Sequence, residues 1–348
     1  MHSAIEQAPF AQLPDGSQVS VFTLKNSAGM TVRILDFGGI ITEIHVPDRD
    51  GAFADVALGF DTLEPYRGDS PYFGALIGRY GNRIAGGRFT LDGQAYTLPV
   101  NNGKNHLHGG VPGFDRVLWR SRVEGNELVL DYRSLDGEQG YPGTVDATVR
   151  YSLDEDNGIS VRFSAVTDRA TPVNLTQHSY FNLAGGGDIL GHVLTIDADN
   201  IVPIDADLIP TGALGPVAGT PFDFRTPVAI GARIDQADQQ LAHGGGYDHC
   251  FALNKPAAGS MSRAARVRDP VSGRVLELFT QEPGVQFYSG NFLGDSVKGK
   301  GRIYGHRSAF CLEPQHFPDS PNRPAYPSTI LRPGEEYTTV MAYKFTTE

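Results

Sequence analysis

Several features that mark other protein classes are scarce or missing in this chain of 348 residues. Its two cysteines, Cys250 and Cys311, are too few for a disulfide-rich secreted scaffold and lack metal-type spacing, although a bond between them stays open. No apolar run is long enough to span a bilayer, and the first residues lack the basic start and apolar stretch of a signal peptide. We therefore expect a soluble cytoplasmic protein with no membrane partner.

The charge pattern and the common ligand motifs are equally sparse. Lys and Arg number 29 against 40 Asp and Glu, a net charge of −11, and no basic cluster stands out, which argues against nucleic acid. No Walker-type lysine, Gly-rich helix start, HExxH or Cys-rich spacing is present. His106 and His108 offer only a weak chelating pair. We expect no metal and no cofactor.

Helical periodicity is scarce as well. The best helical candidate, 228–242, is interrupted by Gly231. Residues 147–165, in contrast, alternate apolar and polar side chains around a Gly-containing loop, which is typical of a hairpin with one buried face. Residues 89–98 form a similar unit with Asp92-Gly93 at a tight turn. Further strands are expected in QVSVFTL, ELVLDYRS and YTTVMAYKF. Many short strands without a composition break predict one all-β domain over residues 1–348, an antiparallel sandwich or barrel.

Polar side chains gather in a few segments of otherwise strand-like sequence. They are GRYGNRIAGG (78–87), NNGKNHLHGG (101–110), TPVNLTQHSYFNLAGGG (171–187), AFCLEPQHFPDSPNRPAYPS (309–328) and the shorter YDHCF and PGVQFYSGNF. If 174–182 is extended, one face carries Asn174, Thr176, His178, Tyr180 and Asn182. By the same alternation Glu313 shares a face with Cys311 and Gln315, and Gln286 with Tyr288. Each strand thus offers a polar face suited to lining a cleft. Pro314 removes a backbone donor beside Glu313, which predicts a sheet edge or a bulge.

Each of these residues also has a structural interpretation. A lone histidine such as His178 is more often a hydrogen-bonded structural group than a catalyst. Glu313, in an apolar run, requires a partner, and a salt bridge to an arginine is as plausible as catalysis. Arg79 and Arg83 are equally open to ion pairing. Trp119 is expected in the core, and no role is assigned to His106, His249 or His316.

Together these blocks resemble the aldose 1-epimerase (galactose mutarotase) family. The matching pieces run in family order from about residue 35 to the C-terminus: GNRIAGGRFTLDGQAYTL, NHLHGG with GFDRVLW, NLTQHSYFNLAG, DHCF, GVQFYSGNF, and LEPQHFPDSPN with LRPGEEY. The resemblance implies a large antiparallel β-supersandwich with few short helices and a sugar-binding cleft on its concave side.

The resemblance also implies roles for individual residues. It makes His178 the acid that protonates the ring oxygen and Glu313 the base at the anomeric hydroxyl, with His108 assisting at the sugar. The positions that match sugar-holding residues are Asn82, Arg83, Asp248 and Gln286, and Tyr180 is added as a contact on the face of His178.

The implied reaction interconverts the α and β anomers of free aldoses such as galactose and glucose. Glu313 is ionised at pH 7 at its reference pKa, and partial burial should raise that pKa and strengthen the base. His178 has to be largely protonated, and we expect a nearby carboxylate to favour its charged form. We interpret Cys311 as a small packing residue near the cleft rather than a nucleophile.

Three other functions are alternatives to this interpretation. A glycoside hydrolase would use Glu313 and Asp248 as paired carboxylates. A sugar-binding protein of the same fold would bind without turnover. A hexose phosphate epimerase would need a cationic pocket, and no dense block of Arg or Lys provides one. The sequence leaves open the physiological aldose and the choice between a monomer and a homodimer.

Overall fold

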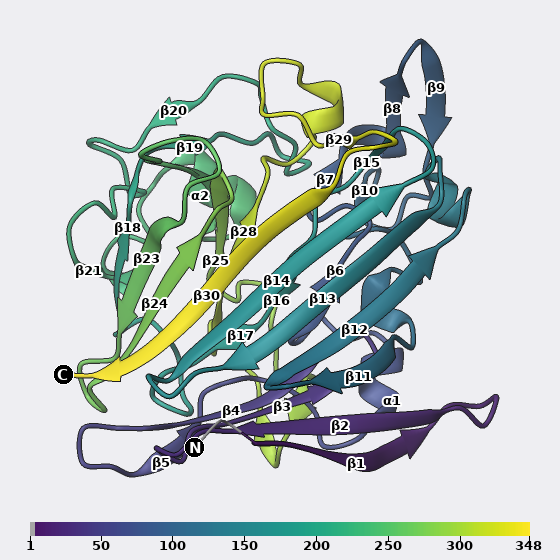
Figure 1. Ribbon diagram of the computed structural model, residues 1–348. Helices are drawn as coiled ribbons and strands as arrows, with labels where there is room; N and C mark the ends of the chain where they lie inside the picture. Colours follow the sequence, from purple (N-terminus) through teal and green to yellow (C-terminus); the bar gives the residue numbers. More distant parts are fainter. Residues whose placement is uncertain (1–3) are drawn as a thin grey trace.

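The structure, a computed structural model, describes residues 4–348. Three large sheets dominate it, and the strands in each pair antiparallel to their neighbours (Figure 1). The nine-stranded sheet runs across the molecule and contains, in spatial order, β11 (Arg120–Glu124), β12 (Glu127–Ser134), β13 (Val145–Leu153), β14 (Gly158–Thr167), β30 (Tyr337–Thr347), β24 (Arg274–Thr280), β23 (Ser262–Arg268), β18 (Val193–Ile196) and β21 (Val228–Ala229).

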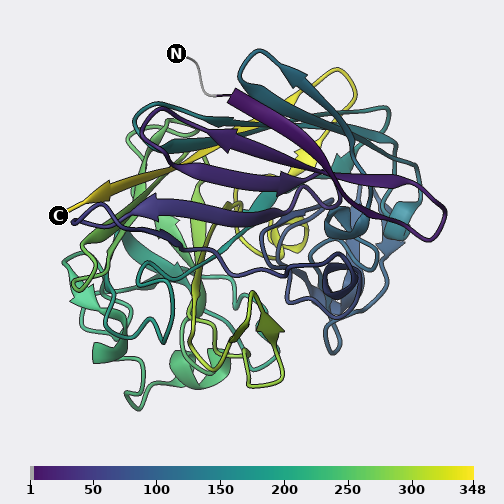
Figure 2. The ribbon, with the colours of Figure 1, turned by 90° about the horizontal axis from the view of Figure 1, so that it is seen from below.

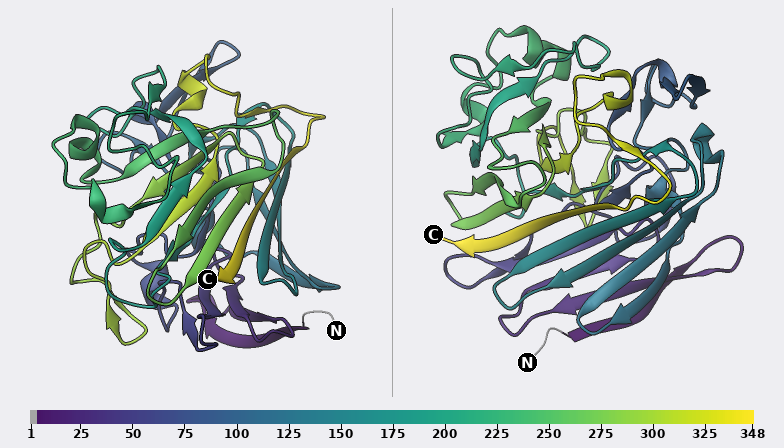
Figure 3. Two further views of the ribbon diagram at one scale, coloured as in Figure 1. Left: turned by 90° about the vertical axis from the view of Figure 1, so that its left-hand side faces the viewer. Right: turned by 45° about the horizontal axis from the view of Figure 1, so that its top comes forward.

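The N-terminal strands form a second sheet of five, seen from below in Figure 2. It consists of β1 (Ala4–Gln12), β2 (Gln18–Lys25), β3 (Thr31–Leu35), β4 (Ile41–Pro47) and β5 (Phe53–Asp55). The third sheet has six strands and lies beside the nine-stranded one (Figure 3), in the order β17 (Tyr180–Phe181), β28 (Phe310–Gln315), β25 (Gly284–Tyr288), β22 (Asp248–Leu253), β19 (Ala198–Val202) and β20 (Gly215–Pro216).

Short two-stranded pairs and helical turns connect these layers. The pairs are β6 (Ala75–Ile77) with β16 (Thr176–His178), β7 (Arg83–Ile84) with β10 (His106–Leu107), β8 (Arg88–Leu91) with β9 (Gln94–Thr97), β15 (Thr171–Pro172) with β29 (Ile330–Leu331), and β26 (Lys298–Gly299) with β27 (Arg302–Ile303). The α-helices are α1 (Glu64–Arg67) and α2 (Gln239–Gly244), and the 3₁₀ turns are η1 (Ala85–Gly87), η2 (Phe114–Arg116), η3 (Glu138–Gly140), η4 (Ile230–Ala232) and η5 (Ser320–Asn322).

The predicted hairpins are confirmed. β13 and β14 pair Val145 through Leu153 with Thr167 through Ile159, and their inward side chains are buried as the alternation indicated. β8 and β9 meet at Asp92-Gly93, where both residues have positive φ, 51° and 81°, as a type I′ turn requires.

The helix expected over 228–242 is mostly wrong. Residues Val228–Ala229 pair with β18 as a sheet edge, and only the turn η4 and the short helix α2 are helical. Asp238 begins α2 by accepting hydrogen bonds from the backbone N–H of Gln240 and Leu241. Sheet pairing at the start of the segment therefore outweighs its weak helical pattern.

One large hydrophobic core joins the three sheets. It includes Phe22 from the five-stranded sheet, Phe163 from the nine-stranded sheet, and Phe287 and Leu312 from the six-stranded sheet, all at most 1% exposed. Trp119 packs edge-on against Phe114 within it, which confirms the expectation for that residue. Since the core takes one face of the six-stranded sheet, the other face is left to line a cleft.

Candidate active site

The strand register of the six-stranded sheet builds one wall of the site. Across β17, β28, β25 and β22, one row of directly opposed residues is Tyr180, Cys311, Tyr288 and Asp248. The next row pairs Glu313 with Gln286. Opposed residues point to the same side of a sheet, so the polar positions of four strands converge on one face. The predicted shared faces of 311–315 and 286–288 are thus confirmed.

The expected continuous strand over 174–182 is not formed, because the segment divides at Ser179 into two strands with different partners. β16 pairs with β6, through His178 opposite Ala75, whereas β17 pairs with β28. As a result only His178 and Tyr180 line the hollow. The other predicted members of that face stabilise the fold. The Asn174 side chain donates to the carbonyl of Gly81 and accepts from the backbone N–H of His316. Thr176 is buried in the pairing with β6, and the Asn182 side chain donates to the carbonyls of Gly187 and Ser308.

The opposite wall comes from β7, β10 and the turns beside them. His108 donates its backbone N–H to the carbonyl of Asn82 (3.1 Å), and its ring Nδ1 accepts the backbone N–H of Asn82 (3.1 Å). Both residues have positive φ, 64° and 52°, a conformation that Asn and His tolerate better than most. With Nδ1 occupied as an acceptor, the neutral ring carries its proton on Nε2. His108 is therefore a fixed hydrogen-bond donor.

These walls enclose a hollow of about 300 Å³. Its lining includes every predicted site residue: Asn82, Arg83, His108, His178, Tyr180, Asp248, Gln286 and Glu313. It also includes residues that the sequence reasoning did not select, namely Pro71, Tyr72, Asn102, Leu107, Leu208, Tyr288 and Phe292. Of these, only Tyr288 carried a usable signal, its alternation with Gln286.

His178 and Glu313 lie side by side in the lining of the hollow. Their Nε2 and Oε2 atoms are 3.4 Å apart, and both side chains are nearly buried, at 6% and 3% exposed. Burial lowers the pKa of His178 to about 4. Burial, followed by the negative charge of Asp248, raises the pKa of Glu313 well above its ordinary value. Both shifts disfavour charge, so the expectation that a carboxylate keeps His178 charged is wrong: desolvation outweighs it.

The surrounding polar groups are tied to one another. Gln286 donates from Nε2 to Oδ1 of Asp248 (2.7 Å), and Arg83 donates from Nε to Oδ1 of Asn102 (3.0 Å). Burial raises the pKa of Asp248 and lowers that of His108 well below its usual range. Oε1 of Gln286 and Oε2 of Glu313 make no hydrogen bond with the described protein atoms, so both are available to a ligand hydroxyl.

The structural interpretations are also resolved. Within residues 4–348, Glu313 lies against His178 and forms no salt bridge with an arginine. Arg79 is a structural residue, buried and donating to Ser134 and to the carbonyls of Pro142 and Gly143. His106, which was given no role, binds the carbonyl of Pro99 and the hydroxyl of Tyr141 away from the hollow.

Pro314 lies at a local sheet edge, as predicted. It faces Val285 of β25, whereas β17 covers only Phe310 and Cys311 on the other side of β28. The two cysteines are unpaired and buried. Cys311 contacts the ring of His178, and burial raises its thiol pKa well above the usual value, so it is not an activated nucleophile.

Two groups of side chains have metal-ligand composition. His108, His178 and Glu313 have donor atoms within 4.8 Å of one another. His108 fits a metal poorly, because the proton on its Nε2 faces the hollow, whereas a metal-bound histidine normally carries its proton on the far nitrogen.

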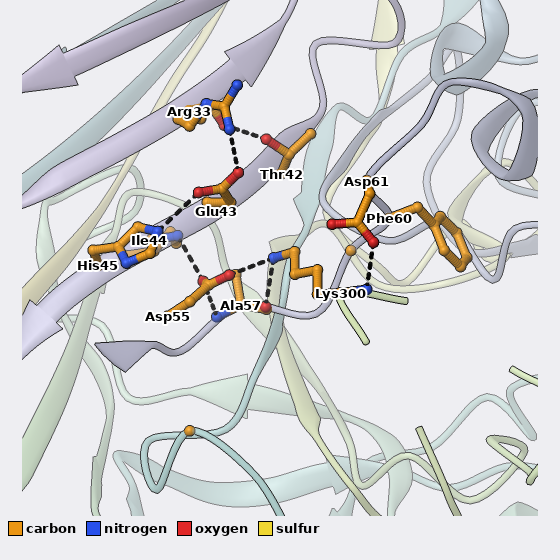
Figure 4. A network of polar contacts seen from close by, with 12 residues as sticks. Arg33, Thr42, Glu43, Ile44, His45, Asp55, Ala57, Phe60, Asp61 and Lys300 are labelled. Atoms are coloured by element: carbon orange, nitrogen blue, oxygen red, sulfur yellow. Dashed lines mark hydrogen bonds and ion pairs between the residues drawn. The ribbon is translucent and has the colours of Figure 1, made fainter. Parts of the chain in front are cut away.

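The second group, Glu43, His45 and Asp55, already contains a cation (Figure 4). The ammonium of Lys300 lies 2.6 Å from Oδ2 of Asp55 and 3.0 Å from the carbonyl of Ala57, and Glu43 pairs with both Arg33 and His45. This network borders a larger hollow of about 480 Å³ and ties the β26–β27 hairpin to β4 and β5. Its His45–Glu43 pair differs from His178 and Glu313 because it favours charge: the hydrogen bond between the two residues lowers the pKa of Glu43 to about 2 and raises the pKa of His45.

Comparisons with known proteins identify the family of the chain. The family model for aldose 1-epimerase matches residues 20–344. The chain is 47% identical over 346 residues to galactose mutarotase of Rattus norvegicus, and the match covers 98% of each chain. It is 41% identical over 342 residues to aldose 1-epimerase of Escherichia coli strain K12, and this match covers 97% of the present chain and 98% of the relative. A crystal structure of an aldose epimerase homologue from C. elegans superposes with a TM-score of 0.87 at 29% identity, covering 99% of each chain. The chain belongs to the aldose 1-epimerase family.

Proposed function

We propose that this protein interconverts the α and β anomers of free aldoses, galactose and glucose among them, with Glu313 as the base and His178 as the acid. The observation that carries the assignment of residues is the 3.4 Å separation of Glu313 Oε2 and His178 Nε2 inside a sugar-sized hollow. The hydroxyl and the ring oxygen that must exchange protons are both bonded to C1. Base and acid must therefore lie within a few ångströms of each other, and these two do.

Ring opening requires one proton to leave the C1 hydroxyl and another to reach the ring oxygen. Glu313 takes the first at Oε2, and His178 gives the second from Nε2, so the C1–O5 bond breaks and the open-chain aldehyde forms. Rotation about C1–C2 exposes the other face of the carbonyl. Closure reverses both proton transfers and restores the two residues. General acid–base catalysis of this kind contributes about 10²–10⁴-fold per group.

The resting protonation state fits this cycle. Burial disfavours charge on both partners and therefore favours a protonated Glu313 beside a neutral His178. Transfer of that one proton from Oε2 to Nε2 produces the carboxylate and imidazolium that opening needs. No proton is gained or lost from solvent, so the pair is ready for either anomer.

The other lining residues hold and orient the sugar. Asp248 and Gln286 are linked by a hydrogen bond and line the hollow with acceptor oxygens, and the charge-assisted bonds that sugar hydroxyls donate to a carboxylate such as Asp248 are stronger than neutral ones. Arg83, Asn82 and Tyr180 add polar contacts, and His108 contributes a neutral N–H donor. A neutral aldose suits these groups better than a phosphorylated one, since Arg83 is the only cationic side chain in the lining.

Polarimetry tests the proposal. Freshly dissolved α-D-galactose and α-D-glucose should approach anomeric equilibrium faster with the protein than in buffer, with the equilibrium position unchanged. Sugar binding without acceleration would favour a binding protein. Release of nitrophenol from aryl glycosides, lost on Glu313→Gln, would favour a hydrolase using Glu313 and Asp248. A panel that adds xylose and arabinose would rank the substrates.

We also propose one domain, a cytoplasmic location, and a monomer or homodimer in solution. The shared core of the three sheets supports the single domain. Two buried, unpaired thiols, Cys250 and Cys311, are compatible with a reducing compartment. In residues 4–348 no helix is long and apolar enough to cross a membrane.

A further inference from the structure

The acid–base cycle above uses only Nε2 of the His178 ring, yet the other ring nitrogen, Nδ1, has a specific neighbour. Sγ of Cys311 lies 3.6 Å from Nδ1 of His178, within hydrogen-bond distance for sulfur. Both residues are almost fully buried, at 4% and 0% exposed, so water does not compete for this contact. The remaining neighbours are rings: those of Tyr180 and Tyr72 stack on His178 at 5.1 and 5.9 Å between centroids, and that of His108 meets it edge-on at 5.1 Å.

The proposed role of His178 fixes what Nδ1 must do. The proton that moves in catalysis is on Nε2, because that atom faces Glu313. After His178 has given this proton away, the neutral ring still holds one proton, which must lie on Nδ1. A buried N–H without an acceptor is costly, and sulfur is a weak acceptor that stands in the right place. The register of the sheet explains why it stands there: Cys311 is opposite Tyr180, two residues from His178.

We propose that Cys311 is a positioning residue whose sulfur accepts the Nδ1 proton of His178 and thereby keeps Nε2 as the atom that exchanges protons with the sugar. The inference rests on the proposed role of His178. A thiol suits this position better than the carboxylate often found behind a catalytic histidine. A carboxylate would stabilise the imidazolium and weaken it as an acid, whereas a neutral sulfur orients the ring without adding charge.

The two histidines of the hollow are then set in opposite tautomers. His108 accepts the Asn82 N–H at Nδ1 and keeps its proton on Nε2. His178 keeps its proton on Nδ1 and leaves Nε2 free to gain and lose one. The groups with charge or protons that face His178 are Glu313 and Cys311 on β28, Tyr180 on β17, Tyr72 and His108. The side chain that contacts it at Nδ1 is Cys311, and a hydrogen bond with its own backbone also favours protonation of the ring.

The tautomers can be read directly. Long-range ¹H–¹⁵N correlation spectra of protein labelled with ¹⁵N-histidine distinguish rings protonated at Nδ1 from those protonated at Nε2, and the variants His178→Asn and His108→Gln assign the signals. In the wild-type protein we expect Nδ1–H at His178 and Nε2–H at His108. An unprotonated Nδ1 at His178 would overturn the proposal, whether or not the protein accelerates mutarotation.

Kinetics supply the second readout. We expect Cys311→Ala to lower kcat about fivefold, which corresponds to the loss of one neutral hydrogen bond, and to leave KM unchanged. In the same variant, the His178 signal should no longer be confined to the Nδ1–H form. Cys311→Ser, which retains a donor and acceptor, should lie closer to the wild type. Cys250→Ala is the matched control, since Cys250 is also buried and unpaired but does not line the hollow, and it should leave kcat unchanged. Equal kcat and pH profiles in Cys311→Ala, Cys250→Ala and wild type would refute the role.

Discussion

Replacing Glu313 with glutamine separates the catalytic from the structural contribution of this side chain. The change keeps the shape and removes the base, so kcat should fall by about 10²–10⁴-fold, equivalent to about 3–5 kcal/mol of activation free energy. Stability should respond in the opposite sense. The pKa of Glu313 is higher in the folded than in the unfolded protein. At pH values above the unfolded-state pKa, this carboxyl group therefore lowers the free energy of unfolding. A neutral amide at the same position removes that penalty. The free energy of unfolding at pH 7 should therefore stay the same or rise.

Glu282 provides a matched control for this experiment. It is another buried carboxylate, 3% exposed, but its Oε2 pairs with Nδ1 of His316 at 2.6 Å outside the hollow. Glu282→Gln should lower the free energy of unfolding by about 1–3 kcal/mol, because it removes a charged hydrogen bond, and leave kcat within a fewfold of wild type. Polarimetry and urea denaturation measure both quantities. The reasoning fails if Glu313→Gln keeps more than a tenth of the wild-type kcat, or if it destabilises the protein as much as Glu282→Gln does.

Four further perturbations test other parts of the structure. His178→Asn should abolish most of the acceleration. The folded-state pKa of His178 is depressed to about 4, so the wild-type protein loses stability as the pH falls below 6.5. The variant should therefore lose less free energy of unfolding between pH 7.5 and pH 5, by up to about 2 kcal/mol. Equal pH dependence of urea unfolding in both proteins would contradict the burial argument. Asp248→Ala should raise KM for galactose about 10- to 100-fold by removing a charged acceptor, and an unchanged KM would exclude it from sugar binding. Lys300→Met should lower the free energy of unfolding by about 1–3 kcal/mol, because the contact with Asp55 is lost, and should leave kcat unchanged. A fall in kcat would mean that the network of Figure 4 affects catalysis in the hollow lined by His178 and Glu313. Treatment with EDTA should leave full activity, and its loss would point to a metal requirement.

Half of the site followed from strand alternation. Glu313, Gln286 and Tyr288 alternate with core residues, and because opposed residues share a face, pairing β25 with β28 necessarily brings them together. The sequence could not show where a strand bends. Residues on the two sides of Ser179 pair with different strands, β6 and β28, although the alternation continues through it.

The other half lies on turns whose shape depends on backbone conformation. Tyr72 and Leu208 reach the hollow from residues with φ of 64° and 61°, which no periodicity predicts for a tyrosine or a leucine. The charge state of His178 was misjudged for a related reason. The expected proximity of Glu313 or Asp248 favoured a charged ring, but the pKa depends on near-complete burial, which only the packed structure shows.

The most direct test of the central claim is a crystal structure of the Glu313→Gln variant with galactose bound. The account predicts one pyranose in the hollow of about 300 Å³, with its C1 hydroxyl within hydrogen-bond distance of the residue at 313 and its ring oxygen within that distance of His178 Nε2. A sugar in that hollow with its ring oxygen turned away from His178, or bound only in the hollow beside Lys300, would contradict it.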